Sequence, residues 1–204
     1  MLDGWDNKDL DNVITYDVTG LTPGITYYVR VRAYNDTDYS EWSNVLTITT
    51  DYWFLPSRDL MMWVYFNLYN AGIGAFTADT YWSSFEDVAT LGYGVEMGSG
   101  TPVSRAKDTT QRVRPCHSFT DSAGHYSEGD IGPYGGYICY KDGTTAYEVS
   151  NEAYETTSTW SNITDIAIGT TSTAVNESKN NTNEIIAQVG HINSAAKYCK
   201  DLNV

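Results

Sequence analysis

A short apolar run that ends at a proline and leads into a helical pattern constrains this fold more than any other feature. Residues 52–55 are Tyr-Trp-Phe-Leu, Pro56 ends the run, and Ser57 stands where a helix N-cap belongs. A serine there accepts a hydrogen bond from a free backbone N–H, and Asp59 in the first turn suits the helix dipole. The pattern predicts a short buried strand that turns sharply into a helix.

The helix that follows is expected to run for about three turns. Leu60, Val64 and Leu68 recur every four residues and share one face, with Trp63 beside them. Residues 70–72, Asn-Ala-Gly, supply a left-handed stop at the C-terminal end. The segment is therefore a predicted structural element, and it does not identify a ligand.

The composition is that of a folded chain rich in strands and turns. Its 204 residues allow one or two domains, and 41% apolar against 19% charged residues argues against bulk disorder. Tyrosine (17) and tryptophan (6) are abundant, while Gly, Thr, Ser and Asn fill the segments between them. We therefore expect aromatic side chains on the exposed loops.

The formal net charge of −14 argues against nucleic acid as a partner, because phosphate binding needs a basic face. Acidity of this kind keeps a protein soluble and does not by itself mark a cation site. No apolar run approaches the roughly 18 residues of a membrane span, so membrane insertion is not expected. The first residues lack the pattern of a secretion signal, so we expect any signal to lie outside this sequence.

Residues 1–50 show the alternation of β-strands, which are predicted at 13–18, 27–33 and 45–49. The run Gly20-Leu21-Thr22-Pro23, followed by Tyr27, resembles the corner of a fibronectin type III module. In that family the tyrosine hydroxyl caps a neighbouring backbone loop. The resemblance covers only the second half of such a module, so residues 1–50 are predicted to form a partial fibronectin type III-like β unit. Its exposed core face and sheet edge favour self-association through the half-sandwich.

The rest of the chain resembles the Lcl C-terminal-domain family, a group of bacterial and phage surface modules similar to C-type lectins in fold. Residues 51–119 match its C-terminal half through Trp53-Phe54-Leu55-Pro56-Ser57, Tyr81-Trp82-Ser83-Ser84 and Arg112-Val113-Arg114-Pro115. Residues 126–204 follow a linker at 120–125. They match the N-terminal half through the Gly-rich stretch 126–138, Trp160-Ser161-Asn162 and Ser194-Ala195-Ala196-Lys197.

The two halves stand in inverted order, because in the family the Ser-Ala-Ala-Lys helix leads directly into the Trp-Phe-Leu-Pro strand. Either the chain is a window on a tandem array, or it is a circular permutant. In both cases we expect the halves to meet, because each alone leaves a helix and a sheet face bare. Helices are predicted at 181–188 and 194–202, the second with Ala195, Cys199 and Leu202 on one face.

The resemblance implies an α+β fold class. Residues 51–204 would form a C-type-lectin-like domain with two main helices on twisted antiparallel strands. Residues 1–50 would add the partial fibronectin III β-sandwich.

Two of the three cysteines fall where the resembling family has apolar residues. Cys116 lies in the predicted last strand and Cys139 in the predicted first, and the short linker lets these strands be antiparallel neighbours. A disulfide is one reading, if the Cα atoms lie within about 7 Å. Two buried thiols that act as small hydrophobic groups are the other. Cys199 is predicted to be buried in its helix and structural.

The sequence carries no pattern typical of a catalytic or metal site. His117, His125 and His191 lack the spacing of zinc ligands, and no nucleophile elbow or phosphate loop occurs. His117 and Cys116 are adjacent in a strand and point to opposite faces, which disfavours a thiol–imidazole pair. The signatures by which calcium-dependent lectins hold sugar are also absent. We therefore expect no enzymatic activity, no cofactor and no metal.

A recognition surface is predicted in the polar region 86–110. In C-type-lectin-like binders the long region before the last strand commonly carries the ligand face, and loops on a rigid scaffold suit recognition. The candidate ligand-binding residues are Tyr93, Glu96, Arg105, Lys107 and Asp108. The alternative is a solvated loop without a partner.

The function that follows is non-catalytic binding or adhesion by an extracellular, cell-surface or phage-borne protein. The expected ligands are glycans or other host or cell-surface polymers. One rival is a structural spacer in a repeat array, without a ligand. Another is an oxidase of the formylglycine-generating type, which shares the lectin-like fold but needs a reactive cysteine pair in one pocket.

Overall fold

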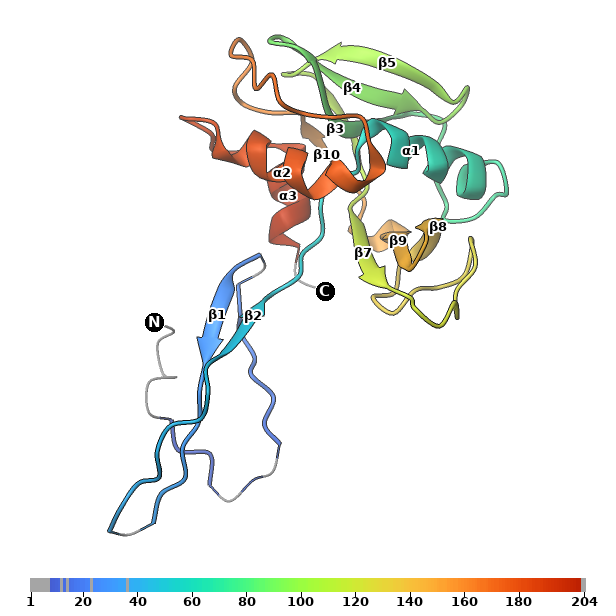
Figure 1. The fold of residues 1–204 in the computed structure, drawn as a ribbon. Helices are drawn as coiled ribbons and strands as arrows, with labels where there is room; N and C mark the ends of the chain where they lie inside the picture. The colour runs from blue at the N-terminus through green and yellow to red at the C-terminus, as the bar shows by residue number, and fades with distance from the viewer. Residues whose placement is uncertain (1–7, 12, 14, 23, 36, 203–204) are drawn as a thin grey trace. The chain divides into compact units, whose positions relative to one another are not determined.

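The computed structural model describes residues 8–11, 13, 15–22, 24–35 and 37–202. The chain divides into two compact units, which we call the first unit (Met1–Thr50) and the second unit (Asp51–Val204). The described elements are mostly β-strands with a few short helices, so the α+β class is confirmed (Figure 1).

The first unit is built around a two-stranded antiparallel sheet of β1 (Thr26–Val29) and β2 (Leu46–Thr49). The hydroxyl of Tyr27 accepts a hydrogen bond from the backbone N–H of Thr22 at 2.8 Å. The predicted tyrosine corner is therefore confirmed, although its Pro23 lies outside the described residues. Apolar side chains of this unit are largely exposed, among them Tyr28, Val31 and Leu46.

The strand predicted at residues 13–18 is wrong for the part that the structure describes. Val13 and residues 15–18 have no regular structure, and Ile14 lies outside the described residues. A strand needs a partner for its backbone N–H and C=O groups. Within the described residues, β1 and β2 pair with each other, and this segment joins neither edge of their sheet.

The second unit begins with the predicted N-cap. The Ser57 hydroxyl accepts a hydrogen bond from the backbone N–H of Leu60 at 3.2 Å and starts α1 (Arg58–Val64). The helix widens into a π-helical turn, η1 (Tyr65–Tyr69), and the chain then leaves it through Gly72 at φ +72°. A left-handed stop is favourable at a glycine because no Cβ clashes there.

One face of this helix is buried as predicted. Leu60, Val64 and Leu68 are fully buried, but Trp63 is 38% exposed and stacks on Tyr140 with ring centroids 4.9 Å apart. Trp63 therefore lies on the outer side of the helix and does not extend the core stripe.

The strands of the second unit form two sheets. The five-stranded sheet has the order β10-β6-β3-β4-β5, in which only β3 and β6 pair in parallel. The strands are β3 (Thr80–Val88), β4 (Leu91–Glu96), β5 (Thr101–Ala106), β6 (Thr110–Val113) and β10 (Thr156–Thr159). The three-stranded sheet has the order β7-β9-β8, with β7 (Cys116–Thr120), β8 (Tyr137–Asp142) and β9 (Thr145–Val149).

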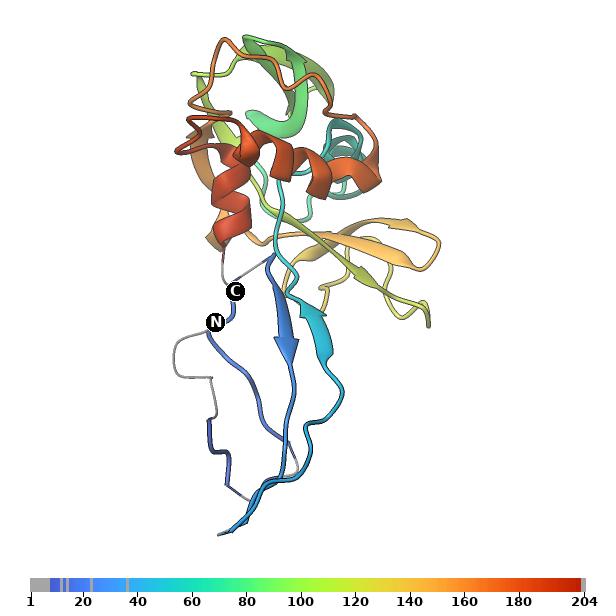
Figure 2. The same ribbon diagram turned by 60° about the vertical axis from the view of Figure 1, so that its left-hand side comes forward.

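The remaining helices join the two halves of the second unit. They are the 3₁₀ turns η2 (Glu152–Tyr154) and η3 (Val175–Glu177), followed by α2 (Ser178–Ala187) and α3 (Ala195–Asp201). Figures 1 and 2 both show α2 and α3 side by side. Leu55 packs in one cluster with Ala196 and Cys199, so residues from before position 119 and after position 126 share a core.

The predicted pairing of the two cysteine strands is wrong. Strand β9 lies between β7 and β8, and Cys116 stands opposite Val149. Cys116, Cys139 and Cys199 are free, buried thiols in the structure. The error has a simple cause: residues 142–145 make a tight hairpin with Gly143 at φ +58°, and this hairpin inserts β9 between the two strands.

Candidate functional site

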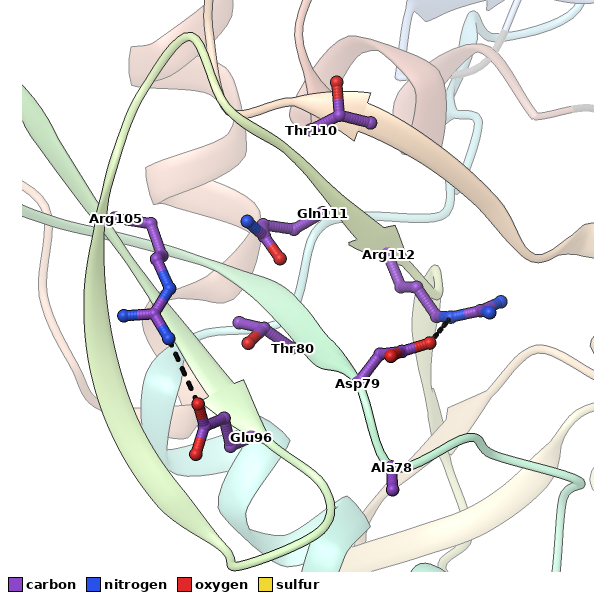
Figure 3. A pocket seen from close by; sticks show the side chains of 8 residues that line it. All are labelled: Ala78, Asp79, Thr80, Glu96, Arg105, Thr110, Gln111 and Arg112. Atoms are coloured by element: carbon purple, nitrogen blue, oxygen red, sulfur yellow. Dashed lines mark hydrogen bonds and ion pairs between the residues drawn. The ribbon is translucent and has the colours of Figure 1, made fainter.

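An open polar groove lies where β3, β4, β5 and β6 come together, and it has a volume of about 430 Å³. A groove of this size is within the range of ligand pockets. Figure 3 shows the side chains that line it. They are Ala78, Asp79, Thr80, Glu96, Arg105, Thr110, Gln111 and Arg112.

Strand register places these residues together. Thr80 at the start of β3 stands opposite Glu96 at the end of β4, and Tyr81 pairs with Arg112 of β6.

Strand β4 carries two glycines, and a Cβ on Gly92 would come within 2.6 Å of the indole of Trp160. Because glycine leaves that space free, the buried Trp160 packs directly against the backbone of β4.

Two ion pairs stand on opposite sides of the groove. The Arg105 guanidinium lies 3.1 Å from the Glu96 carboxylate, and the Arg112 Nε lies 2.6 Å from the Asp79 carboxylate. Gln111 and Thr80 lie between the two pairs (Figure 3). The hydrogen bond from Arg112 lowers the pKa of Asp79, so this carboxyl is ionised at neutral pH. The two arginines and two carboxylates therefore balance in charge.

These pairs are partly exposed, with 32–58% of each side chain accessible. Exposed ion pairs contribute only about 0–1 kcal/mol to stability. Their donors and acceptors consequently remain accessible to a ligand at little cost in folding free energy.

A buried network holds Arg112 in place from behind. Glu155 accepts hydrogen bonds from Arg112, from Arg114 Nη2 at 2.7 Å and from the Tyr81 hydroxyl at 2.9 Å. Arg114 is fully buried, and it also donates to the carbonyl of Gly74 at 3.0 Å. Shared hydrogen bonds of this kind rigidify the side chains that they connect.

The structure brings two of the five predicted ligand residues into the groove. Glu96 and Arg105 face each other there, while the Tyr93 ring packs against Phe85 with centroids 5.3 Å apart. Asp108 is exposed in the turn after β5. The region 86–110 is largely a β-hairpin, β4 and β5, and not a long loop.

The structure corrects the prediction that Lys107 binds a ligand. This side chain is fully buried and cannot meet a ligand from solvent. Its ammonium donates to the Glu86 carboxylate at 2.5 Å, and both side chains are almost completely inaccessible. Glu86 also accepts from the backbone N–H groups of Ile168 and Gly169, each at 2.9 Å. The pair therefore fixes the segment around residue 168 onto the sheet.

Sequence reasoning missed Asp79, Thr80, Gln111 and Arg112 as groove residues. Arg112 was noticed within the Arg-Val-Arg-Pro segment, but only as part of a family resemblance. No spacing along the chain indicates that the start of β3 and the residues of β6 face the β4–β5 hairpin. The antiparallel pairing of β3 with β4 brings Thr80 to Glu96, and the parallel pairing of β3 with β6 adds Gln111 and Arg112.

No group of three or more His, Cys, Asp or Glu side chains among the described residues could hold a metal ion. None of the helices in that part of the chain is long and apolar enough to cross a membrane.

Comparisons with known proteins bear on the first unit. The family model "Fibronectin type III domain" matches residues 5–49, which supports that part of the predicted resemblance. A Kelch domain-containing protein of Saccharolobus solfataricus is 49% identical over 41 residues, which make up 20% of this chain and 6% of that protein. The chain thus matches a small fraction of that relative's length. No solved structure matches the chain.

Proposed function

We propose that the second unit binds a hydroxyl-rich polymer, such as a glycan or a cell-surface polysaccharide, in the polar groove. The observation that carries this proposal is the balanced set of donors and acceptors around Gln111. Carboxylates accept hydrogen bonds, guanidinium groups donate them, and an amide does both. A sugar hydroxyl also donates and accepts, so it can bond to each of these groups.

Charge favours a neutral ligand over a polyanion. The two arginines of the groove are already paired with Glu96 and Asp79. The chain as a whole carries a formal net charge of −14, which repels a polyanion at long range. The buried network behind Arg112 supports preorganisation, which reduces the entropy lost on binding.

Binding without catalysis is part of the proposal. The rival oxidase chemistry needs a reactive cysteine pair, and reactivity requires a thiolate. Burial raises the pKa of the Cys116 and Cys199 thiols well above the ordinary value, which keeps them protonated. The groove residues include no cysteine, serine or histidine that could serve as a nucleophile or its base.

The setting of this function is also proposed. Fibronectin type III domains are often extracellular adhesion or spacer modules. The match to this family supports a secreted or cell-surface adhesin. The virion-borne setting and the C-type-lectin-like fold of the second unit are proposed from the sequence resemblance alone. Exposed apolar side chains on β1 and β2 support self-association through the first unit. A spacer without a ligand is the alternative function, and the fibronectin type III match favours it equally.

Replacing Gln111 with Ala should weaken saccharide binding about 5- to 10-fold, because about 1 kcal/mol is lost with each hydrogen bond. The full chain is applied to an array of neutral and acidic oligosaccharides, and the affinity for those retained is measured by calorimetry. Gln188→Ala, at the only other glutamine of the sequence and outside the groove, is the matched control and should bind as the parent chain does. Absence of binding to every oligosaccharide would favour the spacer.

A further inference from the structure

Away from the groove, a buried histidine lies between two carboxylates. His117 is 2% exposed, its Nε2 lies 3.3 Å from the Asp51 carboxylate, and its Nδ1 lies 3.8 Å from the Glu148 carboxylate. Lys179 approaches Asp51 from α2 at 2.6 Å. Among the residues that the structure describes, Lys179 is the lysine or arginine that pairs with these acids.

Two polar atoms of this cluster are buried without a hydrogen-bond partner: His117 Nδ1 and Glu148 Oε1. They face each other at a distance longer than a hydrogen bond. Leaving buried polar atoms unsatisfied costs about 1–3 kcal/mol each, and more when they are charged. The cluster is therefore sensitive to the number of protons that it holds.

A glycine-rich loop covers the cluster. Gly136 donates its backbone N–H to Glu148 at 3.1 Å, and the Tyr134 ring lies over His117 with centroids 4.0 Å apart. A Cβ on Gly132 would come within 2.2 Å of the Glu148 carboxylate. Glycine at this position allows the loop to close tightly over the carboxylate.

We propose that Asp51, His117 and Glu148 form a proton-controlled lock on the loop 132–136. While Glu148 keeps its proton, no charge is buried on this fully inaccessible side chain. When Glu148 loses its proton, a negative charge is buried there, and its Oε1 has no hydrogen-bond donor within reach. Opening the loop then lets water reach the carboxylate, so the lock releases as pH rises.

The direction of the pKa shifts agrees with this geometry. Burial raises the pKa of Glu148 from 4.5 to about 7, against the opposing hydrogen bonds from the loop backbone. The closed state thus binds more protons than the open state between these values, and closure is lost as pH rises through about 7. Burial also opposes ionisation of Asp51, but hydrogen bonds from His117 and Lys179 outweigh it and keep its pKa low. That carboxylate stays ionised throughout this range.

Amide hydrogen exchange of the full chain tests the lock. Between pH 6 and pH 8, the protection factors of the Gly132 and Gly136 amides should fall about tenfold. The reason is that the pKa of Glu148 is about 7 in the closed state and 4.5 in the open state. Glu148→Gln should remove this dependence, because an amide does not titrate. Glu128→Gln removes one charge at an exposed position of the neighbouring segment. In this variant the protection of the Gly132 and Gly136 amides should still fall as it does in the parent chain.

A second measurement needs no variant. The ¹³C signal of the Glu148 carboxyl should titrate near neutral pH. Titration in the ordinary carboxyl range would overturn the proposal, and so would pH-independent protection in the parent chain. The proposal would also be overturned if the protection factors fell as much in Glu148→Gln as in Glu128→Gln.

Discussion

Replacing Lys107 with Met should lower the free energy of unfolding of the second unit by about 3–5 kcal/mol, the range for breaking a buried ion pair. The substitution leaves the Glu86 carboxylate buried, with the backbone N–H groups of Ile168 and Gly169 as its remaining donors. It also removes the ammonium that lies 4.9 Å from the Trp160 ring centroid. Urea denaturation, followed through the transition of the second unit, measures the loss.

Arg105→Met is the matched control for this prediction. It removes a cation from a pair of which 38% and 40% is exposed, so the expected change is within about 1 kcal/mol. If Lys107→Met destabilised the unit no more than Arg105→Met does, the buried pair would not anchor the segment around residue 168.

Replacing Trp160 with Ala should cost about 3–5 kcal/mol, as for other large-to-small changes of buried aromatic residues. The indole fills the space left by Gly92, and its Nε1 donates to the carbonyl of Ser83 at 2.7 Å. Truncation therefore leaves both a cavity beside β4 and an unsatisfied buried carbonyl. Thermal and urea unfolding of the variant measure the sum of the two effects.

Trp63→Ala provides the comparison, because it removes the same atoms from a side chain that is 38% exposed. The loss should be smaller than at Trp160 because the site is open to solvent and leaves no enclosed cavity, and about 1 kcal/mol of it comes from the stacking on Tyr140. Equal effects at the two positions would contradict the assignment of Trp160 to the core.

Local chemistry made part of the fold predictable from the sequence. Ser57 begins a helix because its hydroxyl satisfies a free N–H, and that requirement is local. Gly72 ends the same element because it tolerates a positive φ. The Tyr27 corner and the helices at 178–187 and 195–201 are of the same kind. Each depends on residues within a few positions of one another.

Features that depend on distant pairing were not predictable. The insertion of β9 between β7 and β8 moved Cys116 and Cys139 out of neighbouring strands. The partner of Lys107 is Glu86, which lies on another strand, so a charge that was expected to face solvent is buried. For the same reason, only part of the groove was predicted. Glu96 and Arg105 lie on one hairpin, whereas Gln111 is brought to them by the pairing of β6 with β3.

The His117 cluster was missed because its members are far apart in the chain. Asp51, His117 and Glu148 come from three separate segments, and the chain offers no motif that links them. Alternation in the strand indicated only that His117 and Cys116 face opposite ways. That reasoning disfavoured a thiol–imidazole pair and left the partners of His117 open.

The central claim is that the polar groove is a saccharide-binding site, and an ¹⁵N NMR titration of the full chain tests it most directly. The probe is the oligosaccharide that the array retains most strongly, added to saturation. The account predicts that the amide shifts concentrate on Thr80, Glu96 and Gln111. Shifts confined to other surfaces, or no shifts with any oligosaccharide of the array, would contradict it.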